Sequence, residues 1–176
     1  KAVEDAPSNS VILLPNNKNV LPAANEVPEL TEKNVRVIPT RSVQTGVAAL
    51  LEFNTNLNLD ENAEAMARVV GDVGDGRVCQ ASRDVTVYGH EIRKGMSFAT
   101  YDDEIVAVGR DPLFVLSKMI EGKLSGAEII TVYTGESVSI EQAKTTTETL
   151  ESKFAEVEFE VVHGGQPHYD YLVAVE

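Results

Sequence analysis

The chain has 176 residues, enough to bury a core without disulfide bonds, either as one large domain or as two small lobes. Hydrophobic residues make up 43% of it and charged residues 24%, which excludes the composition of a disordered chain. The formal net charge of −13 opposes binding to a phosphate backbone, so nucleic acid is not expected as a partner.

Cysteine content and apolar run length indicate the cellular environment. Cys79 is the only cysteine, which rules out an intramolecular disulfide and favours a reducing cytoplasm. The longest apolar runs, residues 11–15 and 129–132, are far shorter than the roughly 20 residues that span a bilayer. Residues 2–6 read as the last turn of a helix, and no signal pattern follows Lys1. We therefore predict a cytoplasmic protein with no transmembrane segment, excised from a longer chain.

The first third of the chain alternates between strand and helix patterns. Residues 11–14 predict a strand, followed by a turn and a helix over residues 20–27. The same strand–loop–helix pattern occurs again, with a strand over residues 35–39, a polar loop and a helix over residues 44–53. Two parallel strands, each followed by a helix, predict a small Rossmann-like βαβα lobe.

A third helix and a glycine-rich segment close this lobe. Asn58 and Glu61 have the spacing of a capping box. The inward positions follow at helical spacing: Leu59, Ala63, Met66, Val70 and Val73. Gly71, Gly74 and Gly76 then break the pattern. We predict a lobe boundary near residue 75, with a truncated parallel lobe over residues 1–75 and a second lobe over residues 76–176.

The second lobe begins with short alternating segments. Residues 77–87, 96–101 and 105–108 predict an antiparallel meander, with a turn near Gly89 and His90. Asp111 and Pro112 then predict the start of a helix that runs toward Gly122, and a strand follows over residues 128–133. Ser139 and Gln142 predict the cap of a second helix, whose inward residues are Ala143, Leu150 and Phe154. The last two predicted strands are residues 157–162 and 169–175. The predicted fold class is mixed α/β, with helices covering the sheet of this lobe.

Polar residues gather where the two parallel strands end. Asn16, Asn17, Lys18 and Asn19 follow the first strand, and Thr40, Arg41, Ser42 and Thr45 follow the second. Loops at the carboxyl ends of parallel strands share one edge of a sheet, so the two groups should be neighbours. Hydroxyls, Arg41 and the helix start would suit a carboxylate or phosphate. The alternative is that these residues only cap and turn the backbone.

Two histidines mark a second candidate region. His163 and His168 flank a loop that contains Gly164, Gly165 and Gln166. An imidazole there could donate a hydrogen bond or a proton to an acyl or phosphate group. The alternative is that both support the final strand from an ordinary loop.

Several kinds of site are not expected. His90, His163, His168 and Cys79 lack the spacing of a zinc site, so no metal is predicted. Asp102 and Asp103 fit a hairpin turn. The sequence contains no Walker-type loop, nucleophile elbow or dinucleotide-binding glycine motif, so we predict no catalysis by this chain alone.

Four segments carry a family resemblance: VILLPNNKNV, VRVIPTRSVQTGVAALLEFN, RDVTVYGHEIRKGMSFA and HGGQPHYDYLVAVE. Together they resemble the C-terminal region of the large, ATP-binding, dihydroxyacetone-kinase-like subunit of bacterial fatty acid kinase. The resemblance implies a DegV-like fold. It also implies that the family's Gly-Gly-Gln-Thr loop and its kinase domain, where ATP and Mg²⁺ are expected, lie upstream of this chain, which itself needs no cofactor.

The resemblance further implies a role in lipid metabolism beside two partners. The large subunit phosphorylates a fatty acid held by a separate DegV-like carrier, so this region would bind that carrier and the rest of its own kinase polypeptide. Carriers hold the fatty carboxylate with hydroxyls and a histidine in a Gly-Ala-His-Thr-Gly segment. The corresponding stretch here is GGQPHYDY, in which His168 takes the histidine's place without that context. Docking is the expected function, and fatty acid or phosphate-ligand binding is the alternative.

Overall fold

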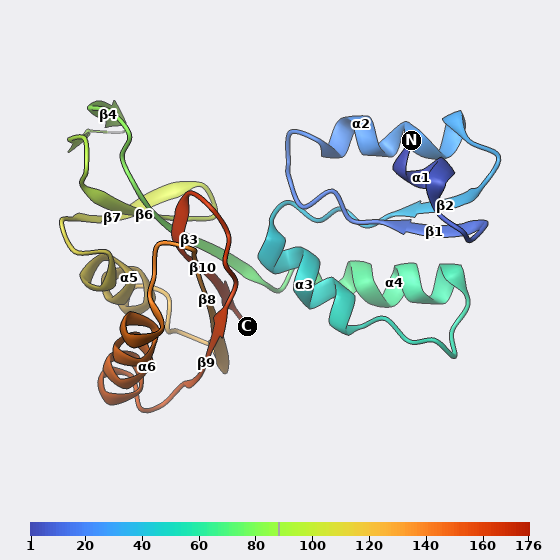
Figure 1. Cartoon of the computed structure of the whole chain (residues 1–176). Helices are drawn as coiled ribbons and strands as arrows, with labels where there is room; N and C mark the ends of the chain where they lie inside the picture. Colours follow the sequence, from blue (N-terminus) through green and yellow to red (C-terminus); the bar gives the residue numbers. More distant parts are fainter. Residues whose placement is uncertain (88) are drawn as a thin grey trace. The chain divides into compact units, whose positions relative to one another are not determined.

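The computed structural model describes residues 1–87 and 89–176, which form two compact units, Lys1–Val73 and Gly74–Glu176 (Figure 1). The chain has a mixed α/β fold, with a two-stranded parallel sheet in the first unit and a six-stranded mixed sheet in the second.

The first unit is a small three-layer arrangement around two strands. Its elements in chain order are α1 (Ala2–Asp5), β1 (Ser10–Leu13), α2 (Leu21–Asn25), the 3₁₀ helix η1 (Val27–Leu30), β2 (Asn34–Val37), α3 (Val43–Leu51) and α4 (Leu59–Val69). β1 and β2 are parallel, with Ser10 opposite Asn34. Figure 1 shows α1 and α2 on one side of the strands, with α3 and α4 on the other.

The core of this unit lies between the strands and the helices α3 and α4. Ile38, Ala49 and Met66 are almost fully buried there, with partly buried apolar side chains around them. The predicted capping box of α4 is confirmed, because Asn58 Oδ1 accepts from the Glu61 amide at 3.0 Å and the Glu61 carboxylate accepts from the Asn58 amide at 2.9 Å. The cap fixes the start of α4, so that Met66 faces inward.

The second unit contains a six-stranded sheet of order β7-β6-β3-β10-β8-β9. Its elements are β3 (Gly74–Gln80), β4 (Val85–Val87), β5 (His90–Ile92), β6 (Ser97–Tyr101), β7 (Glu104–Gly109), α5 (Pro112–Glu121), β8 (Ile129–Thr134), α6 (Ile140–Lys153), β9 (Glu158–His163) and β10 (Tyr169–Val175). β8 and β9 pair in parallel, and the other neighbours in this sheet are antiparallel. Figure 1 shows α5 and α6 covering one side of the sheet.

Local signals set the ends of both covering helices as predicted. Asp111 caps α5 by accepting from the Leu113 amide at 3.1 Å, and Gly122 is its C-cap residue. Ser139 and Gln142 form a capping box at the start of α6. From α6, Leu150 packs into a core that also holds residues of α5, β3, β8 and β10. The helices are thereby anchored on the sheet.

The prediction of one strand over residues 77–87 is wrong. β3 ends at Gln80, and the chain turns away so that β4 and β5 form a separate two-stranded hairpin. At the base of this hairpin the Ala81 amide donates to the Met96 carbonyl and the Gly95 amide donates to the Ala81 carbonyl. The Asp84 carboxylate also accepts from the Lys94 amide at 2.7 Å. The predicted turn near residue 89 is present, with Gly89 at φ 83°, and Tyr88 lies outside the described residues.

Gly74 and Gly76, which end the helical pattern in the sequence, belong to β3, whose first residue is Gly74. A Cβ added at Gly74 would lie 1.8 Å from the Tyr101 hydroxyl, and one at Gly76 would lie 2.8 Å from the Met119 methyl. These glycines therefore permit close packing of side chains on the strand, a use that sequence reasoning did not consider.

Candidate functional site

The carboxyl edge of the two-stranded sheet brings two predicted loops together. The Asn16 amide donates a hydrogen bond of 3.0 Å to Thr40 Oγ1. A Cβ added at Gly46 would lie 2.1 Å from Asn16 Oδ1, so the Asn16 side chain rests on the first turns of α3. Asn16 has φ 52°, a left-handed conformation that asparagine tolerates. The loops that follow β1 and β2 are therefore neighbours, as parallel pairing predicts.

Several polar groups of these loops serve the loops themselves. The Thr45 amide donates to Ser42 Oγ at 3.3 Å, and the Ser42 amide donates to Thr45 Oγ1 at 3.1 Å, which completes a capping box for α3. The Arg41 amide also donates to the Thr45 hydroxyl, and the Asn19 amide donates to Asn17 Oδ1. The structural alternative left open by the sequence thus accounts for these bonds.

One buried acceptor at this edge is not used by the caps. Asn16 Oδ1 is buried and has no hydrogen-bond partner within residues 1–87 and 89–176. Lys18 and Arg41, in the same two loops, are exposed. Because Oδ1 is an acceptor, it would pair with a hydrogen-bond donor. Binding of a carboxylate or phosphate at this edge stays a prediction that rests on the two basic side chains.

A second group of loops lies at the carboxyl edge of the parallel strands β8 and β9. The Gly164 amide donates to the Thr134 carbonyl at 2.9 Å. The Gln166 side-chain amide donates to the Tyr133 carbonyl at 2.9 Å, and the Gln166 carbonyl accepts from the Glu136 amide at 3.1 Å. These bonds hold the loop after β9 against the loop after β8, so both have defined positions.

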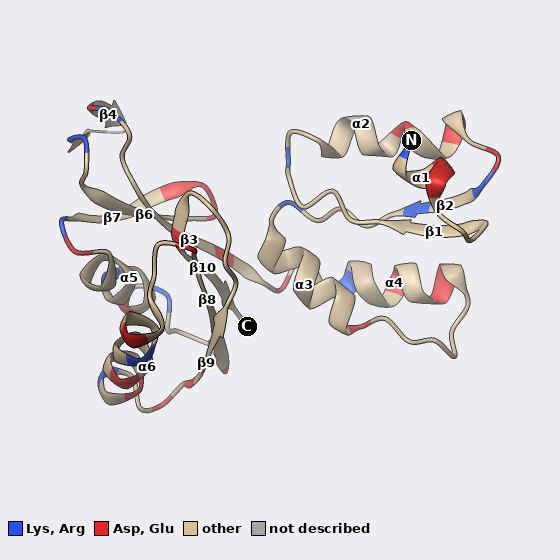
Figure 2. Cartoon of the chain, viewed as in Figure 1, with Lys and Arg blue, Asp and Glu red and all other residues tan. Residues whose placement is uncertain are grey.

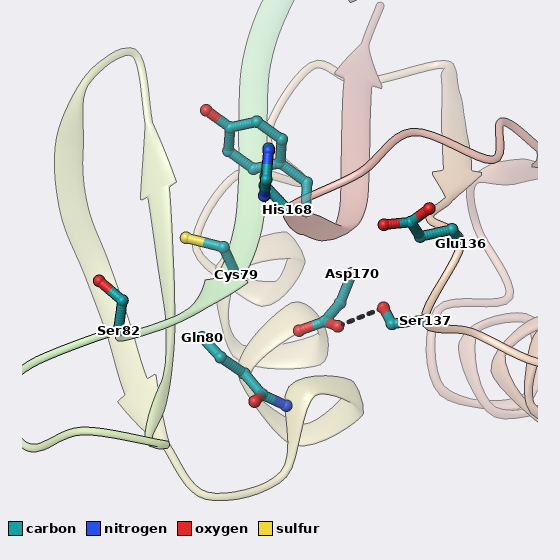
Figure 3. A pocket seen from close by; sticks show the side chains of 8 residues that line it. Cys79, Gln80, Ser82, Glu136, Ser137, His168 and Asp170 are labelled. Atoms are coloured by element: carbon teal, nitrogen blue, oxygen red, sulfur yellow. Dashed lines mark hydrogen bonds between the residues drawn. The ribbon is translucent and has the colours of Figure 1, made fainter.

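The two histidines of this region have different surroundings. His163 ends β9, and its Nδ1 lies 3.5 Å from Thr134 Oγ1. His168 has φ 73° and precedes β10. Its side chain lines a pocket of about 480 Å³ (Figure 3). His168 therefore faces a cavity, whereas His163 and Gln166 contact β8.

The pocket is formed by the end of β3, the loop after β8 and the beginning of β10. It is lined by Cys79, Gln80, Ser82, Glu136, Ser137, His168, Tyr169 and Asp170. Ser137 Oγ donates a hydrogen bond of 2.7 Å to Asp170 Oδ1, drawn as a dashed line in Figure 3. Asp170 is only 8% exposed. The pocket therefore has a buried carboxylate on its wall.

Sequence reasoning missed Asp170 and Ser137. The available signal was Asp170 itself, the single charged residue in the strand Tyr169–Val175. A charged residue in an otherwise apolar buried strand is rare unless it is paired or functional. Ser137 carried no such signal, because it lies in a loop where serine is common.

Cys79 is unsuited to nucleophilic attack. Burial, followed by the negative charge of Asp170, raises the pKa of the Cys79 thiol to about 11. A thiol with this pKa is protonated near neutral pH, and the thiolate is the reactive form. Ser137 does not have the arrangement of a catalytic serine either. Its hydroxyl donates directly to Asp170, whereas in a hydrolytic triad a histidine lies between the serine and the aspartate. The pocket has the groups of a binding site rather than of covalent catalysis.

The first unit has an apolar pocket of about 410 Å³. It is lined by Ser8, Ser10, Ile12, Leu14, Leu50, Phe53, Leu57, Leu59, Asn62 and Met66. Beside it, four large apolar side chains are exposed within eight residues: Leu50 by 58%, Leu51 by 79%, Phe53 by 47% and Leu57 by 38%. We call these four residues the α3 patch. Grouped exposed apolar side chains are typical of binding surfaces.

Metal-binding groups and membrane-spanning helices are absent from the described part of the chain. Within it, no three His, Cys, Asp or Glu side chains are grouped so that they could hold a metal ion. No helix among residues 1–87 and 89–176 is long and apolar enough to cross a membrane.

The comparisons with known proteins bear on the whole chain. The family formed by the C-terminal domain of FakA-like fatty acid kinase subunits matches residues 1–176. The chain belongs to this family. The resemblance drawn from the sequence is thereby confirmed. An uncharacterized protein of Staphylococcus aureus (strain USA300) and one of Staphylococcus haemolyticus are each 33% identical to it over 177 residues. This FakA-like domain spans about a third of their length, 32%.

Solved structures share the fold of the FakA-like domain. The Fatty Acid Kinase (Fak) B3 protein of Streptococcus pneumoniae, loaded with linoleic acid, has a TM-score of 0.62 at 9% identity, over 97% of this chain and 72% of that one. The DegV family protein Cg2579 of Corynebacterium glutamicum has a TM-score of 0.62 at 14% identity, and the match covers 99% of this chain and 78% of that one. The dihydroxyacetone kinase of C. freundii, in complex with AMP-PNP and Mg²⁺, has a TM-score of 0.60 at 14% identity, and the match covers 99% of this chain and 40% of that one. These similarities confirm the predicted DegV-like fold.

Proposed function

We propose that this domain binds a separate DegV-like, fatty-acid-loaded carrier protein and so presents the fatty acid to the kinase part of its own polypeptide. The observation that carries the proposal is the α3 patch in a domain whose family belongs to a fatty acid kinase subunit. Such a subunit works with partners, and Leu51, at 79% exposure, has no role in the core. Phosphorylation of the fatty acid with ATP and Mg²⁺ would belong to the part of the polypeptide outside this chain.

The chemistry of the patch fits a protein partner. Residues 50–57 combine the end of α3 with the following loop, and they place leucine and phenylalanine side chains around an apolar hollow. Aromatic and aliphatic anchors at the centre of an interface contribute most of its binding energy. The carrier is the partner we commit to, because the Fak B3 protein is named as a fatty acid kinase protein and is loaded with linoleic acid.

A single exposed substitution tests this role. Leu51→Ser is expected to weaken binding of the fatty-acid-loaded carrier about tenfold, because a large apolar contact is lost while the folded domain keeps its core. The measurement is calorimetric titration with the carrier. Leu30→Ser is the matched control, since Leu30 is 80% exposed in the same unit and lies outside the patch. Equal affinities for both variants and the unsubstituted chain would contradict docking at the α3 patch.

A second candidate function is binding of the acyl chain itself. The pocket of about 410 Å³ beside the patch has the size of a ligand site and mostly apolar walls. Lipid extraction of the purified chain followed by mass spectrometry tests it. Stoichiometric fatty acid in the extract would favour this function, and a lipid-free chain that still binds the carrier would favour docking alone.

A further inference from the structure

The backbone of β10 is irregular at Asp170. Tyr169 lies opposite Cys79 of β3 and Tyr171 lies opposite the adjacent Val78, so Asp170 is an extra residue in the pairing. This arrangement is a β-bulge, a feature that redirects a side chain. The Asp170 carbonyl accepts from the Gly135 amide at 2.8 Å, which holds the bulge against the loop after β8. The Asp170 carboxylate therefore has a fixed position on the wall of the pocket.

Half of this carboxylate is left unsatisfied. Oδ1 accepts from Ser137, whereas Oδ2 is buried and has no hydrogen-bond partner in the described part of the chain. Figure 3 shows the Asp170 carboxylate directed into the space between Cys79, Gln80 and Ser137. A buried carboxylate oxygen without a partner is costly, and native proteins rarely keep one without a use. A ligand that donates hydrogen bonds would remove this cost.

The charges around the pocket select the ligand. Glu136 and Asp170 both line it, and His168 and the Cys79 thiol are other titratable side chains there. Two basic residues lie near it in the sequence. Arg83 is exposed next to Ser82, and Arg77, whose charge acts on Cys79, is paired with Asp75 and Asp103. Two carboxylates repel a phosphate or fatty carboxylate and attract a cation with N–H donors.

We propose that this pocket binds an ammonium or guanidinium group, supplied by a Lys or Arg side chain of the docked carrier. The assignment of the carrier rests on the proposed function. Residues 74–176 carry 18 acidic and 9 basic side chains, so this unit attracts a basic protein surface. Figure 2 shows acidic residues along much of it. A guanidinium would donate to Oδ2 of Asp170 and to Glu136.

Asp170→Asn is the direct test. Asparagine keeps the shape and can still accept from Ser137, but it replaces the acceptor Oδ2 with an N–H donor. Carrier affinity in calorimetric titration is expected to fall at least about tenfold, because a desolvated charge pair is lost. The midpoint of thermal unfolding is not expected to fall, since an unpartnered buried charge is removed. An unchanged carrier affinity would overturn the proposal.

Glu136→Gln provides a second variant that does not threaten the fold, because Glu136 is exposed. It is expected to weaken carrier binding several-fold, as one of two attracting charges is removed. Glu151→Gln is the matched control, an exposed Glu on α6 outside the pocket, and is expected to bind as the unsubstituted chain does. If Asp170→Asn does not fold, equal affinities for Glu136→Gln and Glu151→Gln would still overturn the proposal.

A small probe separates the pocket from the carrier. N-acetyl-arginine amide is titrated into the ¹⁵N-labelled 176-residue chain, and amide shifts are expected at Gly135, Ser137 and Asp170, but not in Asp170→Asn. Shifts in a chain that does not bind the carrier would contradict the proposed function while supporting a cation pocket. If the probe causes these shifts but Asp170→Asn leaves carrier affinity unchanged, the pocket binds a free small-molecule cation, and the proposal that a carrier side chain occupies it is overturned.

Discussion

Gly135, in the loop after β8, packs against the backbone at the start of β10. A Cβ at this position would lie 1.9 Å from the Tyr169 carbonyl oxygen and 3.0 Å from that of Gln166. Both atoms belong to the backbone, so relief requires the start of β10 to move. That movement would also disturb the bond from the Gly135 amide to the Asp170 carbonyl.

We expect Gly135→Ala to lower the free energy of unfolding by about 1–3 kcal/mol, the usual cost of forcing extra atoms into a packed site. Urea unfolding followed by circular dichroism measures it. Gly122→Ala is the control, because a Cβ there meets its nearest neighbour at an ordinary 3.6 Å. Equal unfolding free energies for the two variants would show that the contact at Gly135 relaxes freely.

Cys79 reports on the charge of Asp170. Because its pKa is raised to about 11 from 9.0, iodoacetamide should label the folded chain at pH 8 about a hundredfold more slowly than an ordinary thiol. Asp170→Asn removes one cause of the raised pKa, so labelling should accelerate and its pH profile should shift to lower pH. A profile that levels off near pH 9 in the unsubstituted chain would contradict this environment.

The same pKa has a consequence for stability. The folded chain holds the Cys79 proton more tightly than the unfolded chain does, since the pKa is raised on folding. The resulting contribution to stability is present below pH 9 and is lost as the pH rises through about 11.

At the scale of single elements, the cap of α6 is the most easily tested feature. Ser139 Oγ accepts from the Gln142 amide at 3.2 Å, and Gln142 Oε1 accepts from the Ser139 amide at 2.8 Å. Ser139→Ala is expected to cost about 1 kcal/mol of unfolding free energy, measured by urea unfolding. Ser152→Ala near the other end of the helix, where the hydroxyl only donates to the Thr149 carbonyl, serves as control. A loss as large in the control would rule out a specific capping effect.

Elements with strong local signals could be predicted from the sequence, and those decided by tertiary contacts could not. Asn58, Asp111 and Ser139 each cap a helix through bonds to residues two or three positions on, so their patterns are visible in the sequence. The packing contacts of Gly74 and Gly76 could not be predicted from the sequence, because their neighbours Tyr101 and Met119 come from distant parts of the chain.

The candidate sites divide in the same way. Adjacency of Asn16 and Thr40 follows from parallel pairing, which the repeated strand and helix pattern predicts. The pocket at Asp170 depends on a bulge and on three segments far apart in the sequence. A bulge at one residue cannot be recognised from the local sequence. His168 was therefore the single residue of this pocket that the sequence identified as a candidate.

At the scale of the whole molecule, two surfaces serve the proposed docking role, the apolar α3 patch and the acidic pocket. The net charge of −13 should speed association with a basic partner surface. Carrier binding should therefore weaken as salt rises from low to physiological concentration, because screening shortens the range of the attraction. This dependence is measured by repeating the titration at several NaCl concentrations, and a salt-independent affinity would contradict a role for charge.

Calorimetric titration of the 176-residue chain with its fatty-acid-loaded carrier tests the docking role most directly, with ATP and free fatty acid as separate titrants. We predict saturable binding to the loaded carrier. Absence of carrier binding, together with saturable binding of free fatty acid, would contradict docking and transfer the function to the apolar pocket of the first unit.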